Sequence, residues 1–191
     1  MILSVVKYGN PVLRRRGAKI EPVTPETHNL IADMFETMRS SKGIGLAAQQ
    51  VGHAIQLAIV DVRGIKDRPS KLWLDGQEAD VESFMPLVLI NPKLTAGGAS
   101  VAGPEGCLSF PDIFGEVIRS AEVDVVAQNE RGETFGFRAG GLLARVVQHE
   151  VDHLNGVLFI DRMDSETRIE IKEEIESLMA ETKGKLSGQK S

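Results

Sequence analysis

The stretch HEVDH holds two histidines, His149 and His153, four residues apart with Glu150 between them. On a helix, residues i and i+4 lie on one face with Cβ atoms roughly 5–6 Å apart, so both imidazoles can point at one metal ion. Glu150 is turned about 100° away from His149, where it can reach a water on the ion instead of the ion itself. The chain has only four histidines, and this spacing predicts a metal site with a carboxylate beside it.

A catalytic site of this kind needs a third protein ligand, and the residues leave two sources open. Zinc proteases of the pattern HExxHxxGxxH use a third histidine, but Phe159 occupies that position here. Other zinc proteases use a glutamate from a downstream helix, and Glu173 and Glu174 lie in a charged run at a suitable distance along the chain. The second source is Cys107, the single cysteine, because a thiolate binds Fe(II), Zn(II) or Co(II) strongly. A lone cysteine is usually a small buried apolar residue, so local sequence favours neither packing nor metal binding for Cys107.

A helix from Leu142 to Asn155 is predicted to carry the two histidines, because Gly140-Gly141 can open it and Gly156 can close it. Leu142 and Val146 continue the histidine face of this helix upstream. The metal site should therefore lie against apolar packing.

The other elements follow from hydrophobic spacing and from the positions of glycine and proline. They are a helix Pro25–Ser40 capped by Thr24, strands Ile55–Val62 and Leu87–Pro92, hairpin strands Glu122–Gln128 and Thr134–Arg138, and an acidic helix Asp164–Thr182. Lys42–Gly52 looks too rich in glycine and alanine for a packed strand, and Gly64–Met85 is expected to be a surface loop. This order predicts an α+β fold, with mixed or antiparallel strands around a central metal-binding helix and a C-terminal helix.

The composition is that of an ordinary globular domain, with 191 residues, 42% hydrophobic and 26% charged. The net charge of −5 disfavours a dedicated DNA binder. No apolar run is long enough to cross a bilayer, and the first 17 residues lack the pattern of a secretory signal. A single cysteine suits a reducing compartment. We expect a cytoplasmic protein with no DNA or membrane partner.

Three motifs occur in order along the chain, GIGLAAQQ (43–50), EGCLS (105–109) and QHEVDH (148–153). Together with the opening GNPVLRR they resemble the signature motifs of the peptide deformylase family, over residues 1 to about 165. The resemblance implies hydrolysis of the N-formyl group from the initiator methionine of new bacterial polypeptides, with N-formylmethionyl nascent peptides as partners and formate as product. We expect a catalytic domain at 1–165, an acidic helix at 166–182 and a disordered tail at 183–191.

The resemblance also implies roles for individual residues. Glu150 would be the general acid and base, and Gln50 and the backbone N–H of Leu108 would face the developing oxyanion. The metal would be Fe(II) natively, with Zn, Ni or Co as substitutes. The implied metal ligands are Cys107, His149 and His153.

Substrate contacts are expected from small residues and from one apolar pocket. A glycine backbone lets a formyl group, which carries only hydrogen where acetyl carries methyl, approach closely, although a glycine-rich turn after a helix would look the same. The side chain of methionine needs an apolar pocket lined by Ile44, Leu142, Val146 and the stem of Arg145. The expected glycine contacts are Gly43, Gly45 and Gly106. Asp152 should anchor the helix, not the metal.

Two features depart from the family pattern. The Gly64–Met85 segment, which holds the single tryptophan, looks longer than in the shortest bacterial members. The C-terminal helix is acidic, whereas docking to the ribosome favours basic residues, so at most a transient ribosome contact is expected. Two other functions fit parts of the sequence: a zinc endopeptidase with a downstream glutamate ligand, and a non-catalytic protein that stores metal or regulates.

Overall fold

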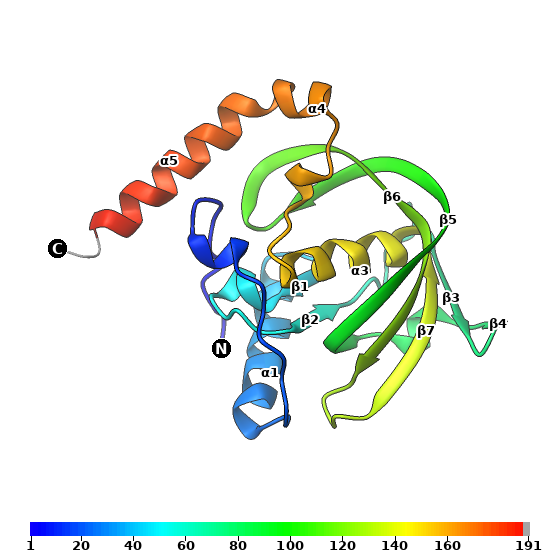
Figure 1. The fold of residues 1–191 in the computed structure, drawn as a ribbon. Coiled ribbons are helices and arrows are strands. Elements are labelled where there is room, and N and C mark those ends of the chain that lie inside the picture. Colours follow the sequence, from blue (N-terminus) through cyan, green and yellow to red (C-terminus); the bar gives the residue numbers. More distant parts are fainter. Residues whose placement is uncertain (189–191) are drawn as a thin grey trace.

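The computed structural model describes residues 1–188, and its centre is the predicted histidine helix, α3 (Gly141–Leu154). Within these residues, seven strands form one sheet in the order β1-β2-β5-β6-β7-β3-β4, and every neighbouring pair is antiparallel. The sheet curves around α3, α1 lies below the sheet in this view, and α4 and α5 run across the upper left, above α3 (Figure 1). The expected α+β fold is confirmed, with antiparallel pairing.

Most expected elements are present, several of them longer than predicted. The strands are β1 (Gly45–Ala47), β2 (Leu57–Val60), β3 (Ser70–Leu74), β4 (Gln77–Glu78), β5 (Leu87–Cys107), β6 (Phe110–Gln128) and β7 (Thr134–Gly140). The helices are α1 (Pro25–Ser40), α2 (Val81–Phe84), α3, α4 (Ser165–Glu170) and α5 (Lys172–Gly188), with 3-10 turns at Pro11–Arg14, Ala48–Val51 and Phe159–Asp161. Helix α1 has the predicted bounds, and the side chain of Thr24 caps it as predicted.

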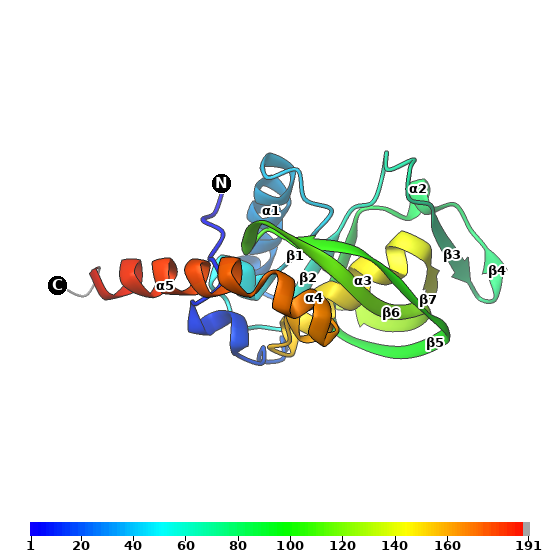
Figure 2. The same cartoon turned by 90° about the horizontal axis from the view of Figure 1, so that it is seen from above.

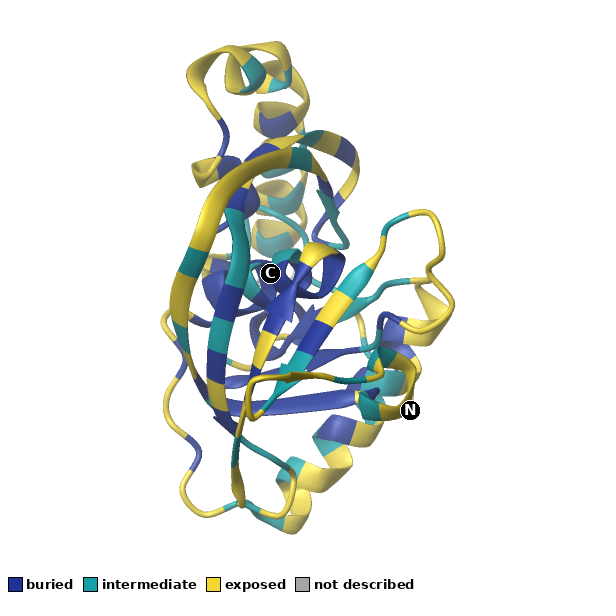
Figure 3. Ribbon diagram, turned by 90° about the vertical axis from the view of Figure 1, so that its right-hand side faces the viewer, coloured by how far each residue is buried: buried dark blue, intermediate teal, exposed yellow. Residues whose placement is uncertain are grey.

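Helix α3 is buried on almost every side, including its polar residues His149, Glu150 and His153 (Figure 3). An all-round buried helix of this kind forms a core instead of a surface. Its first residue, Gly141, has φ +60°, and a Cβ there would lie 2.2 Å from the carbonyl oxygen of Pro69. Only glycine fits this position, so Gly141 fixes the residue at which the helix begins.

Strand β5 was predicted to stop at Pro92, and this prediction was wrong. The pairing with β6 shifts register between Ile90 and Lys93, and Asn91 has φ +51°. Pro92 therefore lies in a bulge, where the ladder needs no N–H from it. The strand continues to Cys107 and delivers that residue to α3.

Two segments expected to lack strands contain short ones. In 64–85, β3 pairs with β7, and Leu72 on β3 is fully buried opposite Ala139. In 42–52, β1 pairs with β2, because Gly45 and Ala47 are small enough to lie between β2 and α3. Low side-chain volume is thus what lets β1 form, although glycine-rich composition usually indicates a loop.

The C-terminal helix differs from the prediction in two ways. It is interrupted at Ile171, so that α4 and α5 are separate, and α5 continues through residues 183–188, which were expected to be disordered. Residues 189–191 of that expected tail lie outside the described part. Seen from above, α5 projects from the body (Figure 2), and Ile175 is its one buried residue within 172–188. No helix in residues 1–188 is both long and apolar enough to span a membrane.

Leu72→Ala tests whether the 64–85 segment is packed. Removing a fully buried leucine should lower the free energy of unfolding by about 2–5 kcal/mol, because the cavity left behind cannot fully collapse. Urea denaturation measures this. Lys71→Ala, an exposed neighbour on the same strand, is the control and should change the free energy by less than about 0.5 kcal/mol. Equal effects of the two substitutions would contradict packing of β3.

Candidate metal centre and active-site cavity

Three side chains from β5 and α3 form a group suited to hold a metal ion, Cys107, His149 and His153. Their ligand atoms all lie within 4.8 Å of one another, and Cys107 Sγ is 3.3 Å from Nε2 of His153. Glu173 and Glu174, the other candidate ligands, are exposed on α5 and do not belong to this group. The structure therefore selects the cysteine as the third ligand.

Glu105 links the strand that carries Cys107 to the helix that carries the two histidines. Glu105 and Cys107 are two residues apart on β5 and both meet α3, where Oε2 of Glu105 lies 2.8 Å from Nδ1 of His149. Burial raises the pKa of Glu105, but His149 and Arg119 outweigh it and hold the pKa well below its usual range. An ionised carboxylate only accepts hydrogen bonds, so Nδ1 of His149 donates and Nε2 keeps its lone pair for a metal.

Glu105 is itself held in a chain of buried charges. Nε and Nη2 of Arg119 donate to its two oxygens at 2.6 and 2.9 Å, and Nη1 of Arg145 donates to it at 2.9 Å. Arg119 also donates to Asp152 at 2.7 Å, and Asp152 accepts a further bond from Arg162. As expected, Asp152 anchors α3 and is not a ligand.

Glu105 and Arg119 were not predicted as site residues. The i, i+2 spacing of Glu105 and Cys107 on a strand could have indicated that both face the metal. No sequence signal indicated Arg119, because only the bulged register of β5 and β6 brings it opposite Val101 and near Glu105.

The electrostatic surroundings of His149 and His153 favour a positively charged ion at the ligand group. Burial lowers the pKa of His149, but bonds to Cys107 and Glu105 outweigh it and raise the pKa to about 10. Burial, and then repulsion from His149, hold the pKa of His153 well below its usual range. Without an ion, His149 therefore carries a second proton on Nε2, which a metal would replace, while His153 is neutral, the form that binds metals. A metal fits these residues.

Glu150 is a buried carboxylate next to the ligands. It is 4% exposed, and its Oε2 has no hydrogen-bond partner in the part of the chain that the structure describes. Burial raises the pKa of Glu150 to about 7. A Cβ on Gly45 would lie 2.3 Å from Oε1 of Glu150, so only glycine at position 45 leaves this carboxylate its place.

Gln50 and Leu108 lie on the other side of the ligands. Oε1 of Gln50 accepts the N–H of Ala47 at 2.9 Å, which turns Nε2 toward Sγ of Cys107 at 3.4 Å and Oγ of Ser109 at 3.5 Å. Leu108 is the first residue of the two-residue turn between β5 and β6. A residue in that position has no ladder partner for its N–H.

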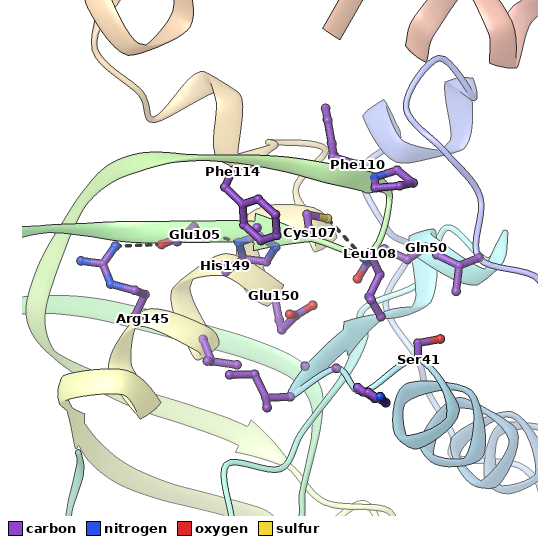
Figure 4. Close-up of a pocket in the computed structure, with 18 of the residues that line it drawn as sticks. Ser41, Gln50, Glu105, Cys107, Leu108, Phe110, Phe114, Arg145, His149 and Glu150 are labelled. Atoms are coloured by element: carbon purple, nitrogen blue, oxygen red, sulfur yellow. Dashed lines mark hydrogen bonds and ion pairs between the residues drawn. The ribbon is translucent and has the colours of Figure 1, made fainter. Parts of the chain in front are cut away.

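A cavity of about 830 Å³ connects these groups (Figure 4). Every predicted site residue lines it except His153, which is 1% exposed and lies beneath the floor. Ile44, Leu142 and Val146 form an apolar wall, while Arg145 turns its guanidinium to Glu105 and to backbone carbonyls. The structure adds lining residues that were not predicted: Lys7, Arg68, Pro104 and Phe114.

Close contacts explain two more glycines of the predicted set. A Cβ on Gly106 would lie 2.6 Å from the ring of Phe114, and one on Gly43 would lie 3.0 Å from Cδ1 of Leu108. Both glycines border the cavity. Side chains at these positions would narrow the space beside Cys107.

The chain is similar to known proteins along nearly its whole length. The family model described as polypeptide deformylase matches residues 2–169. The chain is 47% identical over 178 residues to the peptide deformylase of Methylacidiphilum infernorum, covering 93% of each chain. It is 44% identical over 181 residues to that of Opitutus terrae, again covering 93% of each. A solved structure of an Arabidopsis thaliana peptide deformylase matches with a TM-score of 0.82 at 36% identity, over 96% of this chain and 93% of that one.

These matches extend far beyond half of the chain and agree with the cysteine–histidine–histidine group. The chain belongs to the polypeptide deformylase family, the metal-dependent hydrolases that remove the N-formyl group from nascent polypeptides.

Proposed function

We propose that this deformylase holds Fe(II) on its three ligands, moves the proton with Glu150, and stabilises the oxyanion with Gln50 and the N–H of Leu108. The observation that carries the proposal is the position of Glu150, a buried carboxylate with a free oxygen beside the ligand group. A protein that only stores metal would not need this carboxylate. An endopeptidase with a glutamate ligand is not supported, because Glu173 and Glu174 are exposed on α5.

The donor set supports a soft divalent ion on Cys107, His149 and His153. One thiolate with two imidazoles suits Fe(II), Zn(II), Co(II) and Ni(II), and Fe(II) is proposed from the family resemblance. When bound, such an ion would lower the pKa of a water molecule toward ~7 and polarise the formyl carbonyl. The remaining chemistry belongs to the side chains of the chain itself.

Glu150 carries the proton in this proposal. Its carboxylate accepts the proton that the attacking water loses, and it returns that proton to the methionine nitrogen as the C–N bond breaks. The products are formate and a free amino terminus. Gly45 leaves room for this carboxylate, because a Cβ at position 45 would lie 2.3 Å from Oε1 of Glu150.

Gln50 and Leu108 supply donors for the developing negative charge. The bond from Ala47 N–H holds Oε1 of Gln50, so that its NH₂ group is already turned toward the ligands. A donor that is oriented before the reaction stabilises the transition state without a cost of reorganisation. The N–H of Leu108 would act from the turn beside Cys107.

Substrate binding is proposed for the apolar wall of the cavity. Ile44, Leu142 and Val146 would contact the methionine side chain, with the stem of Arg145 at their edge. The small residues Gly43, Gly45 and Gly106 would let the formyl group and the peptide backbone approach.

The proposed partners are N-formylmethionyl nascent peptides, with at most a transient contact to the ribosome. Helices α4 and α5 expose mainly acidic side chains, which repel the phosphates of RNA. The exposed acidic residues are Glu166, Glu170, Glu173, Glu174, Glu176 and Glu181. A cytoplasmic location is proposed because the substrate is newly synthesised protein and the single cysteine suits a reducing compartment.

Glu150→Gln should keep its metal and lose turnover by at least about 10²–10⁴-fold, because the amide cannot accept the proton from water. Formate release from formyl-Met-Ala-Ser and metal analysis measure the two properties. Glu116→Gln, an exposed position outside the cavity, is the control and should behave as wild type. A Glu150→Gln enzyme within tenfold of wild type would rule out Glu150 as the proton carrier.

Gln50→Ala should lower kcat by about 10²–10³-fold with little change in KM, because its donor meets charge that appears only in the transition state. Steady-state kinetics separates the two constants. Gln49→Ala is a matched control, since the amide of Gln49 donates to the carbonyl of Leu154 and does not line the cavity. An effect confined to KM would make Gln50 a substrate-binding residue instead.

Metal exchange tests the proposal of iron. In air, the iron-loaded enzyme should lose formate release faster than the nickel or cobalt enzyme, because Fe(II) next to the Cys107 thiolate is readily oxidised. A chelator should abolish the activity of all three forms. Time courses in air and under nitrogen measure the decay. Equal decay of the iron and nickel enzymes in air would contradict an oxygen-sensitive iron–thiolate site.

A further inference from the structure

The N-terminal segment runs along one rim of the cavity and contacts both proposed oxyanion donors. Leu3, Val5 and Lys7 line the cavity. Between them, the N–H of Val6 donates to the carbonyl of Gln50 at 2.9 Å. The next N–H on that side, of Tyr8, donates to the carbonyl of Ser109 at 2.9 Å. One extended segment therefore connects the Gln50 turn to the turn that holds Leu108.

Lys7 adds a third bond to this connection. Its Nζ donates to the carbonyl oxygen of Leu108 at 2.7 Å, across 101 residues of sequence. A charged donor forms shorter and stronger hydrogen bonds than a neutral one. The Leu108–Ser109 turn is closed by the ladder pair Cys107–Phe110, but the register of β5 and β6 shifts just before that pair, between Gly106 and Cys107.

We propose that Lys7 is a positioning residue for the deformylase reaction, which holds the Leu108 turn so that its N–H points steadily at the reacting carbonyl. This inference rests on the proposed role of the Leu108 N–H. The carbonyl of Leu108 is tethered by Lys7 and the carbonyl of Ser109 by Tyr8, so rotation of the turn is opposed at two successive peptide units. Donor orientation matters because a hydrogen bond weakens steeply with angle.

The positive charge of Lys7 could itself affect catalysis, and the experiment has to separate this effect from positioning of the Leu108 turn. Lys7 lies near Cys107: burial lowers the pKa of Lys7, and the thiolate raises it. Lys42 provides the comparison, since it is exposed, borders the same cavity and makes no side-chain hydrogen bond within residues 1–188. Removing its charge leaves the Leu108 turn untouched.

The experiment compares three variants of the metal-loaded full chain, Lys7→Met, Lys7→Arg and Lys42→Met, by kcat and KM for formyl-Met-Ala-Ser. Lys7→Met should lower kcat about tenfold, a fraction of what complete loss of an oxyanion donor costs, and leave KM unchanged. Lys7→Arg keeps a charged donor and should restore most of kcat. Lys42→Met should keep kcat within about threefold of wild type. Metal content should stay at one ion per chain in all three.

Several results would overturn the inference. An equal loss of kcat in Lys7→Met and Lys42→Met would assign the effect to charge alone. Loss of metal in Lys7→Met would mean that Lys7 acts through Cys107. A change in KM only, or no recovery in Lys7→Arg, would also exclude positioning of the donor. The proposed function is tested separately by Glu150→Gln, so an unaffected Lys7→Met enzyme beside an inactive Glu150→Gln enzyme would refute the role of Lys7 alone.

Discussion

The hydrogen bond between Glu105 and His149 joins the two halves of the active site. Two residues of the metal site lie on α3 and the third at the end of β5, more than 40 residues earlier, and Glu105 is a second residue of β5 that contacts α3, through His149. It orients the imidazole and leaves the correct nitrogen free. Because Glu105 is buried, it needs Arg119 and Arg145 to balance its charge. Losing one partner of such a buried group typically costs about 3–5 kcal/mol.

The same network explains why the site tolerates so many buried polar groups. Arg119 links Glu105 to Asp152, and Asp152 links α3 to Arg162 beyond its C-terminal end. Each charge has an opposite neighbour at hydrogen-bond distance, which offsets the desolvation of the group. Two buried groups beside this network are exceptions within residues 1–188: Oε2 of Glu150 and Nδ1 of His153 have no hydrogen-bond partner. Leaving the Glu150 carboxylate without a partner costs stability, and carboxylates in such surroundings are concentrated at functional sites.

The HEVDH helix alone does not decide which bond the enzyme hydrolyses. A zinc protease carries the same pair of histidines with the same glutamate, so the two classes share the face of one helix. The difference comes from the strand that closes the site. Here β5 brings Cys107, Gly106 and the turn that starts at Leu108 to the ligand group, and these residues line the cavity together with the apolar Ile44, Leu142 and Val146. The site that the HEVDH motif of α3 begins is therefore completed by β5, a strand far from α3 in the sequence.

Local sequence was sufficient for those features that depend on neighbours along the chain. The i, i+4 spacing placed both histidines on one face, Thr24 and Pro25 marked the start of α1, and the glycines around 140 and 156 bounded α3. The residues that the motif resemblance implied all line the cavity except His153, and the cavity has further lining residues that it did not imply. Spacing alone left the third ligand open between Cys107 and a glutamate of the C-terminal helix, because no local rule states which distant segment meets α3, and only the family resemblance implied Cys107. Tertiary structure decided it: a bulge carries β5 past Pro92, the shifted register brings Arg119 to Glu105, and close packing admits β1 beside Glu150. These features depend on contacts between residues far apart in sequence, and such contacts form only when the whole sheet closes around the helix.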